Sequence, residues 1–490
     1  MYVIIYAVVY LNKMKNNIYY GVKMSENKTL AVKDDKVAVP PENKMGTMPV
    51  NKLLLSMSLP MVISMVIQAL YNIVDSLYVA GISPEQNEFT AISLAFAAQN
   101  FLIAVATGTG VGINALLSKS LGEKNQREAN RIAANGVFLA LCSYLVFLVL
   151  GLTCMETYMG WMTNDPEVIR FGVEYLSICY VCSFGIFGEI VMERLMISTG
   201  RTTLSMITQA TGAIINIILD PIFIFTLDLG IRGAAIATVI GQIIAFGVAI
   251  FLNRRFNKDI HLTFRGFRPS GRIIGKIYAI GVPSIVMASI GSIMNILFNS
   301  ILNSFGAVIG KFAQNAFGAY FKLQSFIFMP IFGLNNGIVP IVAYNYGARK
   351  RKRMMNTAKL GVAYAVGYMF FGVVMFHALP ELLMGIFLTG EAALAIAVPC
   401  IRIISISFIL AGFCIIIGSV FQGLGKSIFS MFVSIARQLV VLIPVAYLLA
   451  QLGDVSLVWW AFPVAEIMSV IASTVFFVII YKKIIAKIPE

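Results

Sequence analysis

The sequence predicts an all-α membrane protein in which twelve transmembrane helices form two parallel six-helix bundles around a central cavity. Three observations predict this fold. The chain is 59% hydrophobic and only 12% charged, whereas soluble proteins carry about 25% charged residues. Long apolar runs recur along the whole chain, and the order of features in its first half returns in its second half. This small number of polar side chains would not cover a surface that faces water. The outer surface of the protein must therefore face lipid.

Twelve apolar runs are each long enough to cross a bilayer as a helix, which takes about 20 residues. They lie at about 53–81, 89–118, 130–154, 168–199, 204–227, 231–253, 276–304, 313–344, 356–380, 394–423, 428–451 and 456–481. Strands of a transmembrane barrel would alternate in polarity over about 10 residues, and these runs do not alternate. We therefore expect twelve helical spans.

The loops between the spans differ in charge, and this difference predicts the orientation. Lysine and arginine residues cluster in SKSLGEKNQREANR after the second span, in 254–276 after the sixth, in ARKRKRMMNTAK after the eighth and in the tail. The alternate loops, such as SPEQNE and QLGD, contain few cations. Cationic loops stay in the cytoplasm. We thus expect a multi-pass protein of the plasma membrane with both termini in the cytoplasm, and no nucleic-acid partner despite the net charge of +14.

The chain repeats one motif of six spans. At a shift of 225 residues STGRTTLSM (198–206) meets GLGKSIFSM (423–431), and at 223 LPMVIS (59–64) meets VPSIVM (282–287). Glycines also coincide: Gly108 with Gly333, Gly112 with Gly337, and Gly122 with Gly347. Six spans return the chain to the same side, so the halves are parallel copies, an arrangement typical of transporters with the substrate path between them. The repeated glycines favour close helix packing.

These features predict the domain organisation. Residues 1–50 are an N-terminal extension, which we expect to be disordered or partly mis-annotated, with translation starting at Met24. Residues 51–253 form the first bundle, 254–275 a cytoplasmic linker, 276–484 the second bundle and 485–490 a cytoplasmic tail.

Four polar residues of the first half lie at one predicted depth. Asp75 and Asp220 each stand about eight residues before the outer end of a span, and Thr238 about eight after the next span enters, so each lies roughly 12 Å deep at 1.5 Å per residue. Asn216 lies one turn from Asp220 on the same helix face. An aspartate at mid-membrane costs roughly 2.5–3.5 kcal/mol, which favours a function for it.

The chemistry of this group suits a small cation. Carboxylate, amide and hydroxyl oxygens are hard ligands that suit Na⁺, and Asp75, Asn216 and Asp220 would hold it. Two close carboxylates would equally share a proton, because both cannot ionise cheaply in a low dielectric. Pro221 removes a backbone donor and frees carbonyl groups beside the site.

The segments PMVISMVIQALYNIVDSLYVAG (60–81), STGRTTLSM and LDPIFIFTLDLGIRGAAIATVIGQ (219–242) resemble the multidrug and toxic compound extrusion (MATE) family, in its DinF-like or MepA-like branch. The resemblance covers nearly all of residues 50–485. It implies two six-helix bundles that export cationic, amphipathic drugs in exchange for Na⁺ or H⁺. It also implies cation coupling at Asp75, Asn216, Asp220 and Thr238.

Two further acids become candidates through this resemblance. A fourth-helix asparagine of some members has no clear match, and Glu189 or Glu193 stands nearby instead. The other branch of the family uses acids on its seventh and tenth helices. Those helices offer only Asn295, Asn299 and Gln422 here, which disfavours that mechanism.

The second half differs in its polar residues. Its intramembrane ionisable residues are Lys322, Arg402, Arg437 and Glu466, of which Arg437 and Glu466 are expected to pair between adjacent spans. The candidates for the lining of the substrate cavity are Gln68, Tyr71, Gln99, Gln324, Phe326 and Phe328. Aromatic faces favour flat cations, although ordinary core packing explains each of these residues better than substrate contact does.

The function predicted from the sequence is a monomeric secondary antiporter that exports small cationic compounds, needs no cofactor beyond the coupling Na⁺ or H⁺, and is not an enzyme. The alternative within the same superfamily is a flippase for lipid-linked precursors, for which Lys322, Arg402 and Arg437 would bind pyrophosphate. An intramembrane protease would need a motif such as H-E-x-x-H and an ATP-driven pump a P-loop. The sequence contains neither.

Overall fold

The computed structural model describes residues 43–80, 82, 87–264, 267–388 and 390–489. The compact unit that begins at Lys44 is helical, and its described residues contain no β-strand. The proposed start at Met24 and most of the expected extension lie outside the described residues. The unit nevertheless begins before residue 51, because the short helix α2 (Lys44–Thr47) belongs to it. Asn345 and Arg353 donate to the backbone carbonyl of Met45, at 3.1 and 3.2 Å.

The first half contains six spans, as predicted. Its helices are α3 (Val50–Ala80), α4 (Asn87–Gly122), α5 (Gln126–Thr153), α6 (Met155–Met162), α7 (Pro166–Val181), α8 (Phe184–Ser198), α9 (Thr202–Pro221), the π-helix η1 (Ile222–Thr226) and α10 (Gly230–Phe256).

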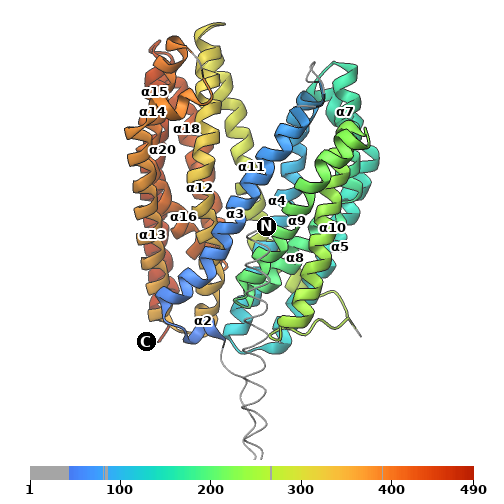
Figure 1. The fold of residues 1–490 in the computed structure, drawn as a ribbon. Helices are drawn as coiled ribbons and strands as arrows, with labels where there is room; N and C mark the ends of the chain where they lie inside the picture. The colour runs from blue at the N-terminus through green and yellow to red at the C-terminus, as the bar shows by residue number, and fades with distance from the viewer. Residues whose placement is uncertain (1–42, 81, 83–86, 265–266, 389, 490) are drawn as a thin grey trace, which may run out of the picture. The chain divides into compact units, whose positions relative to one another are not determined.

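The second half repeats this order. Its helices are α11 (Gly271–Asn303), α12 (Ile309–Gly347), α13 (Arg351–Ala378), α14 (Pro380–Gly385), α15 (Glu391–Ser405), α16 (Phe408–Gly423), α17 (Ser427–Ile435), the π-helix η2 (Ala436–Val441), α18 (Leu442–Ala450), α19 (Val455–Val458), α20 (Ala461–Lys483) and the 3₁₀ turn η3 (Ile485–Lys487). Figure 1 shows the two halves in blue to green and in yellow to red.

The fourth and tenth spans are broken rather than continuous. Ten helices of the described chain are long and apolar enough to cross a membrane, and two bent pairs, α7 with α8 and α15 with α16, bring the number to twelve. The pairs bend by 47° and 45°. At the breaks, the amides of Ser183 and Ser407 bond to carbonyls three residues earlier, at 3.2 and 3.0 Å. This tighter turn ends the α-helix without a proline, so the sequence carried no obvious signal for it.

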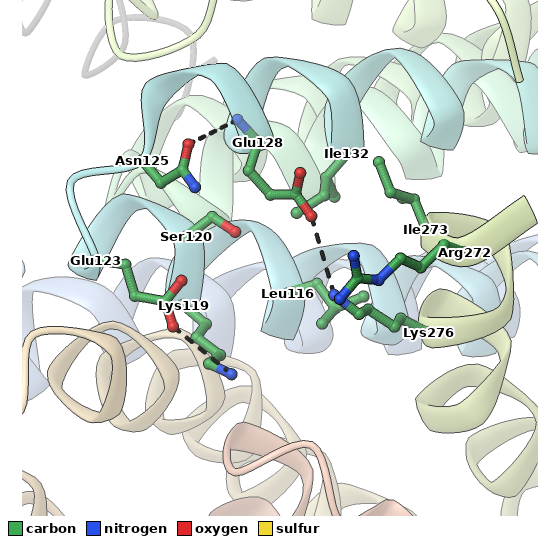
Figure 2. Close-up of a pocket in the computed structure, with 10 residues that line it drawn as sticks. All are labelled: Leu116, Lys119, Ser120, Glu123, Asn125, Glu128, Ile132, Arg272, Ile273 and Lys276. Atoms are coloured by element: carbon green, nitrogen blue, oxygen red, sulfur yellow. Dashed lines mark hydrogen bonds and ion pairs between the residues drawn. The ribbon is translucent and has the colours of Figure 1, made fainter. Parts of the chain in front are cut away.

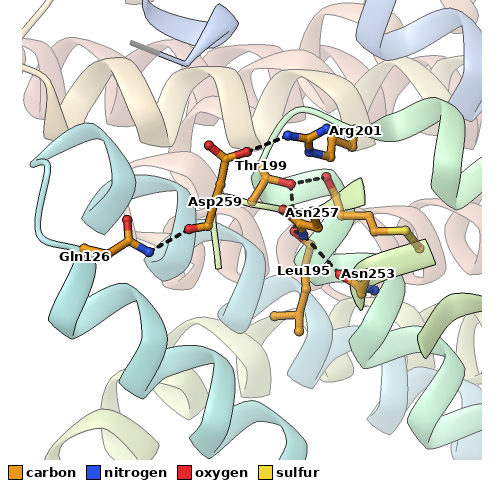
Figure 3. Close-up of polar contacts among 8 residues, drawn as sticks. Gln126, Leu195, Thr199, Arg201, Asn253, Asn257 and Asp259 are labelled. Atoms are coloured by element: carbon orange, nitrogen blue, oxygen red, sulfur yellow. Dashed lines mark hydrogen bonds and ion pairs between the residues drawn. The ribbon is translucent and has the colours of Figure 1, made fainter. Parts of the chain in front are cut away.

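The linker between the halves is shorter than predicted, because α10 continues to Phe256 and α11 already begins at Gly271. Its start is fixed to the first half (Figure 3). The side chain of Gln126 donates to the carbonyl of Asp259 at 2.7 Å, and Arg201 pairs with the Asp259 carboxylate at 3.1 Å. We call the end of the bundle that carries this linker and the turns at Lys124 and Arg349 the basic end.

The two halves meet through α3 with α12, α4 with α11, and α4 with α12. The glycines predicted from the repeat lie in these contacts. A Cβ atom on Gly122 would overlap the carbonyl of Tyr344, and one on Gly347 would overlap the carbonyl of Lys119. Gly108, Gly112, Gly333 and Gly337 likewise meet atoms of the opposite half. Close backbone approach at Gly122 and Gly347 therefore closes the molecule at its basic end.

A charged cavity of about 320 Å³ lies at the same end, between α4, α5 and α11 (Figure 2). Lys276 of α11 faces Glu128 of α5 across it, at 4.0 Å, and thereby adds an ion pair between the halves. Both side chains are substantially exposed, so this pair contributes little beyond about 1 kcal/mol. The packed glycines, rather than the ion pair, hold the basic end closed.

Candidate functional site

Three of the four residues predicted to share one depth form a buried hydrogen-bonded group between α9 and α10. The Asn216 side chain donates from Nδ2 to Asp220 Oδ1 at 3.1 Å and to Thr238 Oγ1 at 3.2 Å. Asp220 is fully buried, and Asn216 and Thr238 are 3% and 4% exposed. Asn216 and Asp220 bond across one helical turn, as their spacing predicts.

Asp75 completes the group from α3. Its carboxyl lies close enough to Asp220 for the two to share a hydrogen bond once either carries a proton. The hydroxyl of Tyr71, one turn earlier on α3, lies close to the side chain of Thr238. The structure thus brings Asp75, Asn216, Asp220 and Thr238 together from three helices. We call these four residues the outer group.

Three oxygen atoms of the outer group remain without a hydrogen-bond partner in the described part of the chain: Asp75 Oδ1, Asn216 Oδ1 and Asp220 Oδ2. Unpartnered buried oxygens are costly, and here they belong to side chains that converge. The described residues contain no group of three or more His, Cys, Asp or Glu side chains that could hold a metal ion. Two carboxylates with amide and hydroxyl oxygens instead form a donor set suited to a single hard cation or a proton.

The local backbone explains how α9 presents these oxygens. Pro221 ends the α-helix one residue after Asp220, and the chain continues as the π-helix η1. In η1 the amide of Leu227 reaches the carbonyl of Ile222 at 2.9 Å. Such π-turns occur frequently at functional sites. Below the group, Gly212 and Gly241 let α9 and α10 cross closely, since a Cβ on Gly241 would lie 2.9 Å from the Gly212 carbonyl oxygen.

Two residues beside the outer group were missed by the sequence analysis. Tyr175 on α7 is 2% exposed, and Gln99 of α4 donates to its hydroxyl at 3.3 Å. Tyr175 and Cys179 lie within electrostatic range of Asp75. Neither residue carries a charge, and the C-x-x-C that Cys179 forms with Cys182 is explained by small buried side chains. The only available signal was a phenol and a thiol one turn apart in the fourth predicted span.

The remaining candidates lie elsewhere. Glu189 and Glu193 do not join the outer group but form a separate cluster with Gln209 of α9. Of the predicted cavity residues, Tyr71 and Gln99 lie beside the outer group. Phe328 packs on Phe408, with ring centroids 5.2 Å apart. Gln68 and Phe326 are exposed, and Gln324 is half-buried.

The second half contains no counterpart of the outer group. At a shift of 225 residues, Val441, Val445 and Pro463 replace Asn216, Asp220 and Thr238, and at 223 Phe298 replaces Asp75. Phe298 is fully buried against Phe317 and Phe462, with ring centroids 4.7 and 5.1 Å away. Aromatic side chains therefore pack where the repeat places the counterpart of Asp75.

The predicted pair of Arg437 and Glu466 is confirmed. Arg437 Nη1 lies 3.0 Å from Glu466 Oε2. The same shift of 225 residues aligns these two residues with Gly212 and Gly241. At this crossing the first half has two packed glycines, whereas the second half has an ion pair. In that pair the guanidinium permanently neutralises the buried acid.

We expect Arg437→Met to lower the melting temperature clearly, because it leaves the Glu466 carboxylate, whose side chain is 6% exposed, without its partner. Removing one member of a buried pair costs about 3 kcal/mol or more. Thermal unfolding in detergent measures this. The double variant Arg437→Met, Glu466→Leu should recover most of the loss, since it buries no charge. Equal melting temperatures for Arg437→Met and the wild type would contradict the assignment of a stabilising ion pair.

Comparison with known proteins gives consistent matches. The MatE family model matches residues 60–222 and 283–448, and the two stretches begin at Pro60 and Pro283, which the repeat aligns. The multidrug export protein MepA of Staphylococcus haemolyticus (strain JCSC1435) is 28% identical over 85% of this chain and 90% of its own. MepA of Staphylococcus aureus (strain MRSA252) is 26% identical over 87% and 93%.

Solved structures share the fold. An outward-facing multidrug resistance MATE family transporter of the MOP superfamily is similar with a TM-score of 0.84 at 23% identity, covering 90% of this chain and 98% of that one. A MOP superfamily transporter from Pyrococcus furiosus Vc1 (DSM3638), described as having a binding pocket of reverse polarity, gives a TM-score of 0.85 at 23% identity over 91% and 99%.

Proposed function

Because the chain belongs to the MatE family, whose model matches both of its halves, we propose that it is a secondary antiporter that exports cationic, amphipathic drugs in exchange for Na⁺ or H⁺. Membership makes it a multi-pass membrane transporter of the MepA-like branch rather than an enzyme. The drug specificity in this proposal is supported by relatives that are named as multidrug export proteins.

One observation carries the proposed coupling: three unpartnered oxygens of Asp75, Asn216 and Asp220 belong to one buried group. In a low dielectric, two neighbouring carboxylates repel strongly unless a cation or proton lies between them. Occupancy therefore neutralises the site and draws α3 towards α9. The release of the ion removes this attraction. The free-energy difference between the arrangement with α3 close to α9 and the arrangement with α3 further away therefore depends on whether the ion is bound.

The closure of the basic end supports a direction of transport. We propose that the basic end faces the cytoplasm, since cationic loops remain there. The ion then reaches the outer group from outside while the halves are packed at Gly122 and Gly347. Pro60 lies inside α3 and Pro221 at the end of α9, the helices that carry Asp75 and Asp220. These prolines supply the bending points through which occupancy changes the helices and favours release of the drug.

The test uses purified protein in proteoliposomes loaded with a fluorescent cationic dye. Dye export is followed first under an inward Na⁺ gradient at equal pH, and then under an inward H⁺ gradient without Na⁺. We expect one gradient to accelerate export and its collapse by an ionophore to stop it. Export that proceeds equally without any gradient would contradict antiport.

The flippase alternative receives less support. It requires free cations around a pyrophosphate-sized cavity, but Arg437 is already paired with Glu466. Lys322 lies over the ring of Phe387 at 5.5 Å, and Arg402 is exposed. Failure of the protein to rescue a strain that lacks its lipid-precursor flippase, together with dye export in the vesicle assay, distinguishes the two functions.

A further inference from the structure

A second buried polar cluster lies in the first half, between α8 and α9. Gln209 Nε2 donates to Glu193 Oε2 at 2.8 Å, and Glu193 is 3% exposed. Its other oxygen, Oε1, has no hydrogen-bond partner among the residues that the structure describes. The outer group does not include any of these side chains, and transport as described above does not use them.

Further oxygens surround the same carboxylate. Ser205 is fully buried on α9, its hydroxyl faces Glu193, and it has no completed hydrogen bond within the described chain. Gln209 Oε1 is equally without a partner there. Glu189 stands one turn before Glu193 on α8, within electrostatic range of it. The oxygens of Ser205, Gln209 and Glu189 thus lie near the buried carboxylate of Glu193, which would be costly without compensation.

The net charge of the cluster can be balanced by one monovalent cation. Glu189 and Glu193 contribute two negative charges, and Arg194 contributes one positive charge. Arg194 lies within electrostatic range of Glu193, and its Nη1 also donates to Asn336 Oδ1 of the other half at 3.1 Å, so its charge offsets one of the two acids. The remaining single negative charge equals that of one Na⁺ or one proton.

The cluster is aligned with the outer group along α9. Ser205, Gln209, Asn216 and Asp220 are spaced by four, seven and four residues, which places them on one face of the helix. Gln209 lies seven residues before Asn216, about 10 Å nearer the basic end at 1.5 Å per residue. The second half lacks the two acids of the cluster, since Cys414 and Gly418 replace Glu189 and Glu193 at the repeat shift.

We propose that Glu189, Glu193, Ser205 and Gln209 form a second, inner site for the same monovalent cation, which the ion occupies between the outer group and the basic end. The proposal rests on the antiport function given above. The Arg194–Asn336 contact joins the two halves beside this site. Opening of the basic end breaks that contact and exposes the inner site, so the ion leaves in the state that accepts the next drug molecule.

The variant Glu193→Gln tests this inference, because glutamine still accepts the hydrogen bond from Gln209 and loses only the charge. Three measurements use the full-length protein with Na⁺ and, separately, H⁺ as the probe: cation displacement of a bound dye at equilibrium, gradient-driven dye export, and inhibition of export by cation added on the basic-end side. The exposed Glu156→Gln serves as the matched control.

We expect Glu193→Gln to retain displacement of the dye, since the outer group is intact. Its rate of dye export should fall about tenfold. The cation concentration on the basic-end side that halves export should rise about tenfold. Both changes lie within the usual range of coupling between two sites. Unchanged export and unchanged inhibition would overturn the inner site. Loss of dye displacement in the wild type would instead overturn the antiport proposal, so the two failures are distinguishable. Should Glu193→Gln not fold, Ser205→Ala and Glu189→Gln must show the same shifts.

Discussion

Replacing Asp220 by Asn should strongly reduce gradient-driven drug export while leaving the protein folded in the membrane. Asparagine has the shape of aspartate and still offers an oxygen to Asn216 Nδ2, which lies 3.1 Å from Asp220 Oδ1. It removes the charge that attracts the cation to the unpartnered Oδ2. Loss of a coupling energy of 1–3 kcal/mol lowers export by about 5- to 150-fold. Dye efflux from proteoliposomes under the effective gradient measures this change.

Two controls accompany the Asp220→Asn variant. Glu156→Gln removes an exposed carboxylate from α6 and should transport like the wild type. Binding of the dye to purified Asp220→Asn should persist, which separates lost coupling from lost substrate binding. Export at the wild-type rate by Asp220→Asn would refute its role in coupling.

Replacing Gly347 by Val should open the basic end. A Cβ atom at Gly347 would overlap the Lys119 carbonyl of the opposite half, and the obstacle is backbone, which yields less easily than a side chain. Overpacking of this kind costs roughly 1–3 kcal/mol, so the closed arrangement should lose about tenfold or more in population, and transport should fall with it. Spin labels at Arg127 on α5 and Asn356 on α13, both exposed, report the separation of the halves.

Gly367→Val provides the matched control for this variant. Gly367 lies inside α13, and a Cβ atom there meets nothing within 4 Å. The control therefore has the same cost of placing valine in a helix but no clash between the halves. If Gly347→Val gave the same label distances and the same export as Gly367→Val, the glycine contact would not be what closes the basic end.

Much of the fold follows from the sequence because lipid imposes strict patterns. Apolar runs of sufficient length identify the spans, and the repeat aligns glycines such as Gly122 and Gly347, which the structure places where the halves meet. The bends at Ser183 and Ser407 could not be predicted in the same way. They arise from a local change in hydrogen bonding that no proline announces.

The candidate site was predictable where charge marked it and not elsewhere. Asp75 and Asp220 are expensive in a membrane, so their presence alone identified them, and helix periodicity joined Asn216 to Asp220. Tyr175 escaped notice because a buried phenol in an apolar span is unremarkable until its neighbours are known. Glu189 and Glu193 were grouped with the outer residues, yet in the structure Glu193 bonds to Gln209 of α9 instead, since the depth of both acids depends on how α8 packs after the bend.

The central claim is that the outer group binds the driving cation and that this binding opposes binding of the drug. The most direct measurement is the dissociation constant of a fluorescent cationic dye for the purified protein as a function of cation concentration, compared between the wild type and Asp75→Asn. We expect the constant to rise with cation in the wild type, by the reciprocity of linked binding, and to stay flat in the variant. An equal rise in both proteins would contradict the account.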